Sequence, residues 1–585
     1  MNFFRYYKTY RLFAQKNKSI YYFSFVMVFL FSAVLNLSTF TVGQLINEFK
    51  LGDINLFRNI GLIALTLVLP SIFEPILFTL RNKLYVNVYT DVLKNVYSKT
   101  LLQDYDYHTK RSSGKLINII LKSDTIVDIY LYSFELILFM GIIETLVIIT
   151  FIAIVSPKLI IPIIITQCIL IYPEVYSITR SVRLRRSAKN DEHEVAIYVS
   201  DILNSYENVR SFRKENFEIN RFFEIANRLN KSVYSYMQGF RLMDVVMAIN
   251  QILTVLLTAS VAIKLYTLGE ITFANLIVVI SFLLTLKNKV SSVLLAIRNT
   301  FKDISRLEDT IDLLNLPESV VKIGNQTIDL EKPIDIKFEN ISFEYNSNKP
   351  IINNLSLEIK HKEDIAFVGP SGGGKTTLVK LLLRYYLVDS GRILINDIDI
   401  KDLKEETLQM IFAVVPQDPV MFNQSLLYNI GYGLDVDPTQ LENHMASIVE
   451  VCKKAQIYDF IMSLPEGFDT KVGERGIKLS GGQRQRVAIA RTLLKDPKVI
   501  IFDEATSMLD SESEHAIQLA ISEIAREKTM IFIAHRLSTI RHCDKIFVID
   551  SGELIESGTH KELLAGNGIY NKIWNIQSGG FINFK

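Results

Sequence analysis

Cysteine and tryptophan are scarce in this sequence of 585 residues, which contains three cysteines and one tryptophan. Cys168, Cys452 and Cys543 lie far apart in the chain and lack the short spacings of metal-binding cysteines. The scarcity argues against a disulfide-stapled fold and against a zinc site. We expect the three thiols to be ordinary core or helix residues.

An excess of charge of one sign is also missing. The chain has 64 Lys and Arg against 62 Asp and Glu, a net charge of +2, and 49% of its residues are hydrophobic. This composition excludes a disordered chain and gives no strongly basic surface, so no nucleic-acid partner is expected.

Long apolar runs are abundant, but nearly all of them lie before residue 300. A helix needs roughly 20 residues to cross a hydrocarbon core of about 30 Å. Six runs are long enough, at approximately 20–46, 58–80, 130–155, 158–178, 243–266 and 272–297. We therefore predict a transmembrane domain of residues 1–315 with six helices in contact with membrane lipids.

The connections between these runs alternate between short and long. The long ones, 81–129 and 179–242, are basic and helix-prone, with Arg180, Arg183 and Arg185 in the second. The positive-inside rule places both on the cytosolic side or its equivalent, together with everything after residue 298. Their composition predicts membrane helices that continue well into the water.

A glycine-rich stretch, "GPSGGGKTT", follows the apolar "DIAFV" and precedes "LVKLLLRYY", which has helical periodicity. This is a complete phosphate-binding loop in a strand–loop–helix context. Backbone N–H groups of such a loop hold phosphates, Lys375 reaches the β and γ oxygens, and the Thr376 hydroxyl ligates Mg²⁺. The expected nucleotide contacts are Gly369, Ser371, Gly372, Gly373, Gly374, Lys375, Thr376 and Thr377.

Two adjacent carboxylates end a second apolar strand in "VIIFDEATSMLD". Asp503 can hold Mg²⁺, and Glu504 can accept a proton from the attacking water, as phosphoryl transfer requires. Alone, such a pair is typical of a solvated strand end. With the phosphate loop it predicts a catalytic site.

The segment "LSGGQRQRVAIARTLL" predicts a helix with Ser480 as its N-cap. Gly481 and Gly482 leave its positive N-terminus bare, which suits a phosphate. Because the chain already has one phosphate loop, this second anion site is expected to complete the nucleotide site of another copy.

Together, "GPSGGGKTT", "LSGGQ", "VIIFDE", the glutamine in "VVPQDP" and the histidine in "IFIAHRLSTI" resemble the nucleotide-binding domain of an ATP-binding-cassette (ABC) transporter over about residues 334–578. The implied fold class is an α-helical six-span transmembrane domain of the type I/IV exporter fold, fused to an α/β P-loop domain. The linker is placed at 316–333 and the cassette at 334–585.

The resemblance implies roles for residues that the motifs alone do not explain. Two cassettes would close head to tail, with ATP and Mg²⁺ between Lys375 of one copy and Ser480, Gly481, Gly482 and Gln483 of the other. Tyr345 would stack on adenine, Gln417 would link the γ-phosphate and Mg²⁺ to the membrane domain, Asp510 would contact the partner, and His535 would sense the γ-phosphate. Glu504 and "LSGGQ" are both intact, which favours a homodimer.

Six spans before one cassette resemble the B-type half-transporters. "VPQDPVMFNQSLLYNIGYG" and "LNSYENVRSF" are similar to the ABC transporters of mitochondria and their bacterial relatives. This implies export of glutathione-derived, sulfur-containing or metal-thiol compounds tied to iron–sulfur assembly. The implied location is the inner membrane of a mitochondrion-derived organelle or of a bacterium, with the cassette on the matrix or cytoplasmic side.

Two lysines interrupt the sixth apolar run in "SFLLTLKNKVSSVLLAI". Charges inside spans are costly and usually face a cavity or a partner. Lys287, Ser291, Leu294 and Arg298 form one helical stripe, whereas Lys289 points about 200° away. We predict that Lys287, Ser291 and Arg298 face the cavity and attract an anionic thiol such as glutathione, and that Lys289 either pairs with a neighbouring acid or extends its ammonium to the membrane surface.

The fifth run carries Asn250 and Gln251, the reverse of the family's usual Gln–Asn order, and both are added to the predicted substrate cavity. The family's usual Pro-Leu-Asn pattern is absent from the sixth run, which has "KNKVSSVLLAIR" in its place. A lipid flippase or multidrug exporter, and an ATP-gated channel, remain alternatives.

Overall fold

The computed structural model describes residues 15–51, 56–129, 139–317, 324–345, 350–473, 476–504, 511–525, 527–534 and 537–577. The chain divides into two compact units. The first comprises Met1–Gln103 and His108–Glu318, and the second comprises Asp104–Tyr107 and Ser319–Lys585. The main division thus falls inside the segment predicted as the linker.

The first unit is built from long helices. Its main helices are α2 (Lys18–Leu51), α3 (Leu56–Leu101), α5 (Ser113–Leu121), α6 (Thr125–Val127), α7 (Phe139–Val155), α8 (Ile160–Asn204), α9 (Tyr206–Ser211), α10 (Glu215–Gly239), α11 (Arg241–Thr267) and α12 (Phe273–Asn315). The short helix α4 (Tyr105–Thr109) lies where the two units meet in the chain.

All six predicted apolar runs fall on helices in the described residues. Lys18–Gly43, Ile60–Leu101, Glu215–Thr267 and Phe273–Ile297 include stretches apolar and long enough to cross a membrane, and Gly141–Val155 and Pro157–Ile169 are shorter apolar helices. Residues 130–138 of the third predicted run lie outside the described residues. The two long connections are helical, as predicted, because α3, α8 and α10 run through them.

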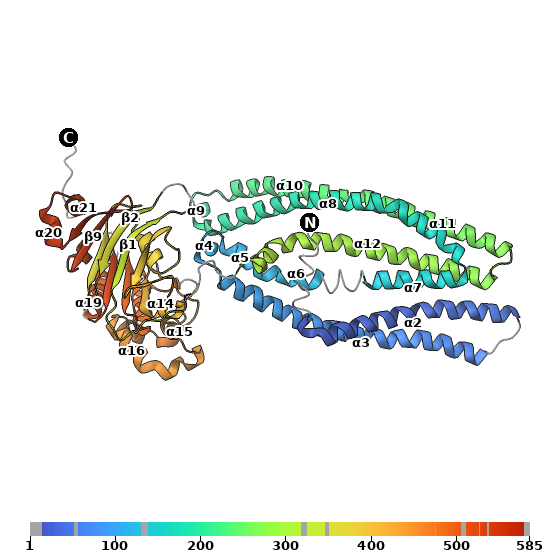
Figure 1. Cartoon of the computed structure of the whole chain (residues 1–585), viewed down its shortest axis with the longest axis horizontal. Coiled ribbons are helices and arrows are strands. Elements are labelled where there is room, and N and C mark those ends of the chain that lie inside the picture. The colour runs from blue at the N-terminus through green and yellow to red at the C-terminus, as the bar shows by residue number, and fades with distance from the viewer. Residues whose placement is uncertain are drawn as a thin grey trace. The chain divides into compact units, whose positions relative to one another are not determined.

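Helices of the first unit pack lengthwise on one another. In Figure 1, α2 lies along α3, α8 lies along α10 and α11, and α12 lies along α7. Gly43 and Gly141 allow close approach, because a β carbon there would lie 2.0 Å from a methyl group of Val278 and 2.2 Å from one of Val293. Both valines belong to α12, which therefore packs tightly against α2 and α7.

The second unit contains two sheets. One is antiparallel with the order β2–β1–β4–β5, and the other has the order β10–β9–β3–β8–β7–β6, parallel except for its edge strand β10. The strands are β1 (Ile336–Phe343), β2 (Ile352–Ile359), β3 (Asp364–Val368), β4 (Ser390–Ile395), β5 (Ile398–Asp399), β6 (Phe412–Val415), β7 (Val499–Asp503), β8 (Thr529–Ile533), β9 (Lys545–Asp550) and β10 (Glu553–Gly558).

Alternate residues of the parallel strands enter two different cores. Ile365 and Phe367 of β3 join the core shared with the antiparallel sheet, whereas Ala366 and Val368 join the core under the helices. The helices are α13 (Lys375–Leu382), α14 (Glu405–Ile411), α15 (Leu426–Gly431), α16 (Met445–Lys454), α17 (Tyr458–Ser463), α18 (Gly481–Leu494), α19 (Ser511–Ile524), α20 (His560–Ala565) and α21 (Ile569–Gln577). Because strands buried on both faces end together, loops at their carboxyl ends can form one site.

Candidate functional site

The phosphate loop joins the end of β3 to the start of α13. Gly369 has φ +148° and Gly374 has φ +106°, values that favour glycine. A β carbon on Gly369 would lie 1.9 Å from the carbonyl oxygen of Ile549 in β9. Gly369 therefore cannot take a side chain without moving β9.

The side chain of Lys375 turns back into this cradle. Lys375 is 5% exposed, and its ammonium donates to the carbonyl oxygens of Gly369 and Pro370, both at 2.9 Å. Burial lowers the pKa of Lys375, while the nearby carboxylates of Glu504 and Asp503 act in the opposite direction. The ammonium of Lys375 has lost most of its water and is held by two neutral carbonyl oxygens, so negatively charged phosphate oxygens would bind it more strongly.

The predicted acids follow β7, with Asp503 as its last residue. Glu504 adopts φ +51°, an uncommon conformation for a residue with a side chain, and its N–H donates to the carbonyl oxygen of Ile533 at 3.0 Å. The amide of Gln417 donates to Oε2 of Glu504 at 2.7 Å. The structure thus brings Gln417 to the pair Asp503 and Glu504, although Gln417 and Glu504 are 87 residues apart in the sequence.

The site contains the oxygen ligands that Mg²⁺ prefers, namely a carboxylate, an amide and a hydroxyl. Asp503, Gln417 and Thr376 would hold the ion, which would neutralise charge on the phosphates during transfer. Among the described residues no group of three or more His, Cys, Asp or Glu could hold a metal.

Tyr345 lies beside the helix that follows the loop. Its hydroxyl is 3.3 Å from Oγ1 of Thr377, and its ring is half-buried. The residue predicted to stack on adenine is therefore next to the residues predicted to bind phosphate.

Ser480 caps α18 as predicted. Its hydroxyl accepts from the N–H of Gln483 at 3.2 Å, and the Gln483 side chain accepts from the N–H of Ser480 at 2.9 Å, a reciprocal capping box. One turn further on, the buried Gln485 donates to the carbonyl oxygen of Pro416 at 3.2 Å. The helix capped by Ser480 is thus hydrogen-bonded to Pro416, the residue before Gln417. The motifs did not predict this contact.

Some predicted residues cannot be placed. Asp510 and His535 lie outside the described residues, and so does the side chain of Arg298. Their proposed roles remain predictions.

In the helical unit, Gln251 of α11 contacts α12. Its amide donates to Oγ of Ser291 at 2.6 Å and to the carbonyl oxygen of Lys287 at 3.4 Å. The side chain of Lys287 is exposed. Three of the predicted substrate residues are therefore neighbours.

Asn250 differs from the expectation that it faces a cavity. It is 1% exposed and donates to Oε1 of Gln167 at 3.4 Å, while its Oδ1 accepts from Thr254 at 3.0 Å. Thr254 in turn donates to Thr166 of α8 at 2.8 Å. Because unsatisfied polar groups are costly in lipid, this network ties α8 to α11. Leu294, on the same stripe as Lys287, also differs, since it is 6% exposed and packs with Phe240 and Met243.

Lys289 pairs with an acid, as predicted. Its ammonium forms an ion pair with Glu144 of α7, whose side chain is 1% exposed. The pair lies one turn from the close approach of Gly141 to Val293. It neutralises a carboxylate that would otherwise be buried alone among apolar helices.

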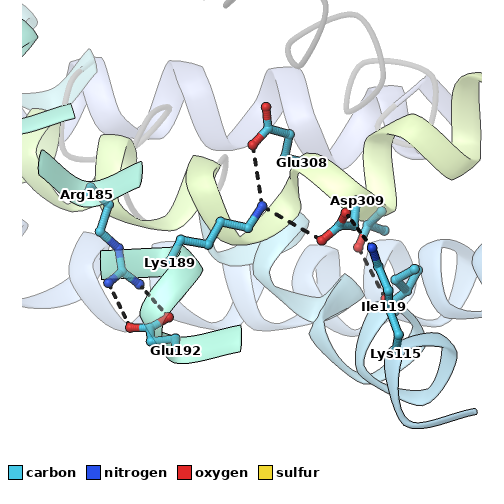
Figure 2. Close-up of polar contacts among 8 residues, drawn as sticks. Lys115, Ile119, Arg185, Lys189, Glu192, Glu308 and Asp309 are labelled. Carbon is cyan, nitrogen blue, oxygen red and sulfur yellow. Dashed lines mark hydrogen bonds and ion pairs between the residues drawn. The ribbon is translucent and has the colours of Figure 1, made fainter. Parts of the chain in front are cut away.

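A second set of charges links three helices beyond the apolar runs (Figure 2). Lys189 of α8 reaches Glu308 at 3.4 Å and Asp309 at 3.7 Å on α12, and Lys115 of α5 reaches Asp309 at 3.6 Å. Nearby, the buried Arg185 forms a two-pronged contact with Glu192, at 2.8 and 3.2 Å. Two cations of the second long connection, Arg185 and Lys189, are therefore balanced by acids within the same unit.

Family models match both units. The model of the ABC transporter domain matches residues 352–507, and that of the ABC transporter transmembrane region matches residues 47–290. The chain belongs to the ABC transporter family.

Within this family, the chain is an ABC half-transporter that resembles ATM1-type proteins. It is 38% identical to "Iron-sulfur clusters transporter ATM1, mitochondrial" of Gibberella zeae over 68% of this chain and 57% of that protein. It is 32% identical to "ATM1-type heavy metal exporter" of Novosphingobium aromaticivorans over 86% of this chain and 83% of that protein. A solved bacterial Atm1-family ABC exporter with ATP bound matches with a TM-score of 0.85 and 29% identity, over 96% of this chain and 98% of the other.

Proposed function

We propose that this protein is an ATP-driven homodimeric exporter of glutathione-derived, sulfur-containing or metal-thiol compounds linked to iron–sulfur protein assembly. The observation that carries the proposal is the joined set of Lys375, Gln417, Asp503 and Glu504 in a chain whose described residues include four apolar helices long enough to cross a membrane and two shorter ones. The names of the ATM1-type relatives support the substrate class.

In the proposed cycle, ATP lies between the phosphate loop of one copy and Ser480 of a second copy. Lys375 exchanges its two loop carbonyls for phosphate oxygens. Glu504 accepts a proton from the attacking water, with Gln417 orienting its carboxylate. Because each chain has both halves of the site, two identical chains would form two competent sites.

The proposed substrate contact is formed by Lys287, Gln251 and Ser291, with Arg298 on the same face of α12. An exposed ammonium within a membrane helix attracts an anion, and the Gln251 amide and Ser291 hydroxyl add hydrogen-bonding groups. Glutathione carries net negative charge and suits this group. We place the protein in an organellar or bacterial inner membrane with its cassette on the matrix or cytoplasmic side.

The test is ATP hydrolysis by the purified protein in lipid nanodiscs. We expect reduced or oxidised glutathione to raise the rate of ATP hydrolysis. The Glu504→Gln variant should show no glutathione-stimulated hydrolysis. Stimulation by lipids or hydrophobic drugs, with no response to either thiol compound, would overturn the substrate class in favour of a flippase or multidrug exporter. Ionic currents that outpace hydrolysis would instead indicate a channel.

A further inference from the structure

The ring of Tyr386 contacts two other tyrosines of the second unit. Its centroid is 5.0 Å from that of Tyr345, with the rings at 87°, and 5.9 Å from that of Tyr105, at 79°. Phe343 also contacts it, at 5.6 Å. Such edge-to-face contacts are directional, so rotation of one ring affects the others. Tyr386 therefore connects the predicted adenine-stacking residue to Tyr105.

Lys380 joins the same two tyrosines by a second route. Its ammonium lies 6.0 Å from the ring centroid of Tyr345 and 5.6 Å from that of Tyr105. A cation shared by two ring faces favours an arrangement in which both rings keep their places. Two independent contacts thus link Tyr345 to Tyr105.

The turn that carries Tyr386 is firmly anchored. Arg384 has φ +56°, and its side chain is 1% exposed. Its guanidinium donates to the carbonyl oxygens of Ile400 at 2.9 Å and Leu403 at 2.6 Å and pairs with Glu405. The next residue, Tyr385, stacks on Tyr105 at 4.6 Å and 8°. The anchored turn therefore holds Tyr385 and Tyr386 beside Tyr105.

We propose that Tyr386 is a positioning residue that couples stacking of the nucleotide base on Tyr345 to the seating of Tyr105. The inference rests on the proposed role of Tyr345 in binding adenine. A base on the face of Tyr345 restricts its ring, which steadies Tyr386 and Lys380 and hence Tyr105. Linkage is reciprocal, so the seating of Tyr105 also sets the affinity for the base. All the residues of this contact set, Tyr105 included, belong to the second unit.

The test is a double-mutant cycle on the full-length protein in nanodiscs. KM and kcat are measured for ATP and for UTP, whose smaller base stacks less strongly. We expect Tyr386→Leu to raise KM for ATP three- to tenfold with little change in kcat and to reduce the preference for ATP. Tyr386→Phe, which keeps the ring, should restore both values. The combined effect of Tyr105→Leu and Tyr345→Leu on KM should differ at least threefold from the product of their separate effects. In a protein that also carries Tyr386→Leu and Lys380→Gln, the combined effect should equal that product.

Tyr428→Leu is the matched control, because Tyr428 belongs to a separate aromatic group with Phe422 and Tyr432. This variant should leave the ratio of the KM values for ATP and UTP unchanged. Additive effects of Tyr105→Leu and Tyr345→Leu in the otherwise unchanged protein would overturn the inference. If Tyr345→Leu itself leaves KM for ATP unchanged, the adenine assignment fails instead, so the two failures are distinguishable.

Discussion

The side-chain amide of Gln417 donates a 2.7 Å hydrogen bond to Oε2 of Glu504. One of these residues is predicted to contact Mg²⁺ and the other to activate water. Their contact fixes the orientation of the carboxylate, and Glu504 has the uncommon backbone angle φ +51° at the strand end. We therefore propose general-base function for Glu504 and a positioning role for Gln417.

Replacing Glu504 by Gln should lower ATP hydrolysis by at least about 100-fold, because the general base is lost. Binding of a fluorescent ATP analogue should change by less than about threefold, since the oxygen that accepts from Gln417 can be retained. Both quantities are measured on the purified full-length protein. Glu523→Gln, on the exposed face of α19, is the control. Hydrolysis within tenfold of the unaltered protein would show that another group is the base.

Replacing Lys287 by Ala or Glu should abolish the stimulation of hydrolysis by glutathione and leave basal hydrolysis in place, because the exposed cation is lost while the cassette is unchanged. The control is Lys264→Ala, another exposed lysine within a membrane helix, on α11. If Lys289→Ala alone removes the stimulation in a protein that remains folded, the wrong face of α12 has been assigned to the substrate.

Replacing Lys289 by Met should destabilise the helical unit, because Glu144 is left buried without its cation. Breaking a buried pair costs about 3–5 kcal/mol, and about 1–3 kcal/mol is expected here since Lys289 is partly exposed. The double variant Glu144→Gln, Lys289→Met should recover most of the loss. Thermal unfolding in detergent measures all three proteins, and equal melting temperatures for the single and double variants would contradict a paired role.

Replacing Asp364 by Asn should alter how stability depends on pH. Burial, with the like charge of Asp544, raises the pKa of Asp364 to about 7. The pKa of an Asp in the unfolded chain is about 3.9. The contribution of Asp364 to stability is therefore fully present below about pH 4 and is lost as pH rises through about 7. The Asn variant should therefore gain stability relative to the unaltered protein between pH 5 and pH 8.

Trp574 in α21 is the only tryptophan of the chain, so its fluorescence reports unfolding of the second unit directly. Glu442→Gln, at an exposed position, serves as the control for the pH series. A difference between Asp364→Asn and the unaltered protein that is the same at pH 5 and pH 8 would refute the titration.

Replacing Gly369 by Ala should abolish nucleotide binding, because the added β carbon would lie 1.9 Å from the carbonyl oxygen of Ile549. Binding of the fluorescent analogue should fall by more than tenfold. Gly566→Ala is the matched control, since a β carbon there meets its nearest atom at 3.6 Å. Normal binding by Gly369→Ala would mean that the loop can move away from β9.

The sequence was sufficient to predict the helices and the phosphate loop, because hydrophobic runs and glycine spacing follow directly from lipid thickness and loop geometry. Pairing with an acid was also one of the two outcomes predicted for Lys289, and it is the one observed. It misplaced Asn250 because helical periodicity gives a direction around one helix and does not say which neighbouring helix lies there. Tyr386, Lys380 and Gln485 were missed for a related reason. Their contacts join segments far apart in the chain, and no spacing rule encodes them.

The helices α3, α8 and α12 contain 46, 45 and 43 residues. At about 1.5 Å per residue each is roughly 65–69 Å long, more than twice the thickness of a hydrocarbon core. Each helix is thus a lever with an arm of about 27–39 Å beyond its predicted apolar run. A tilt of only about 5° would swing an arm of roughly 35 Å through about 3 Å. Pro70 and Pro75 in α3 and Pro173 in α8 interrupt the hydrogen-bond ladder, so they mark the points where such a lever can bend.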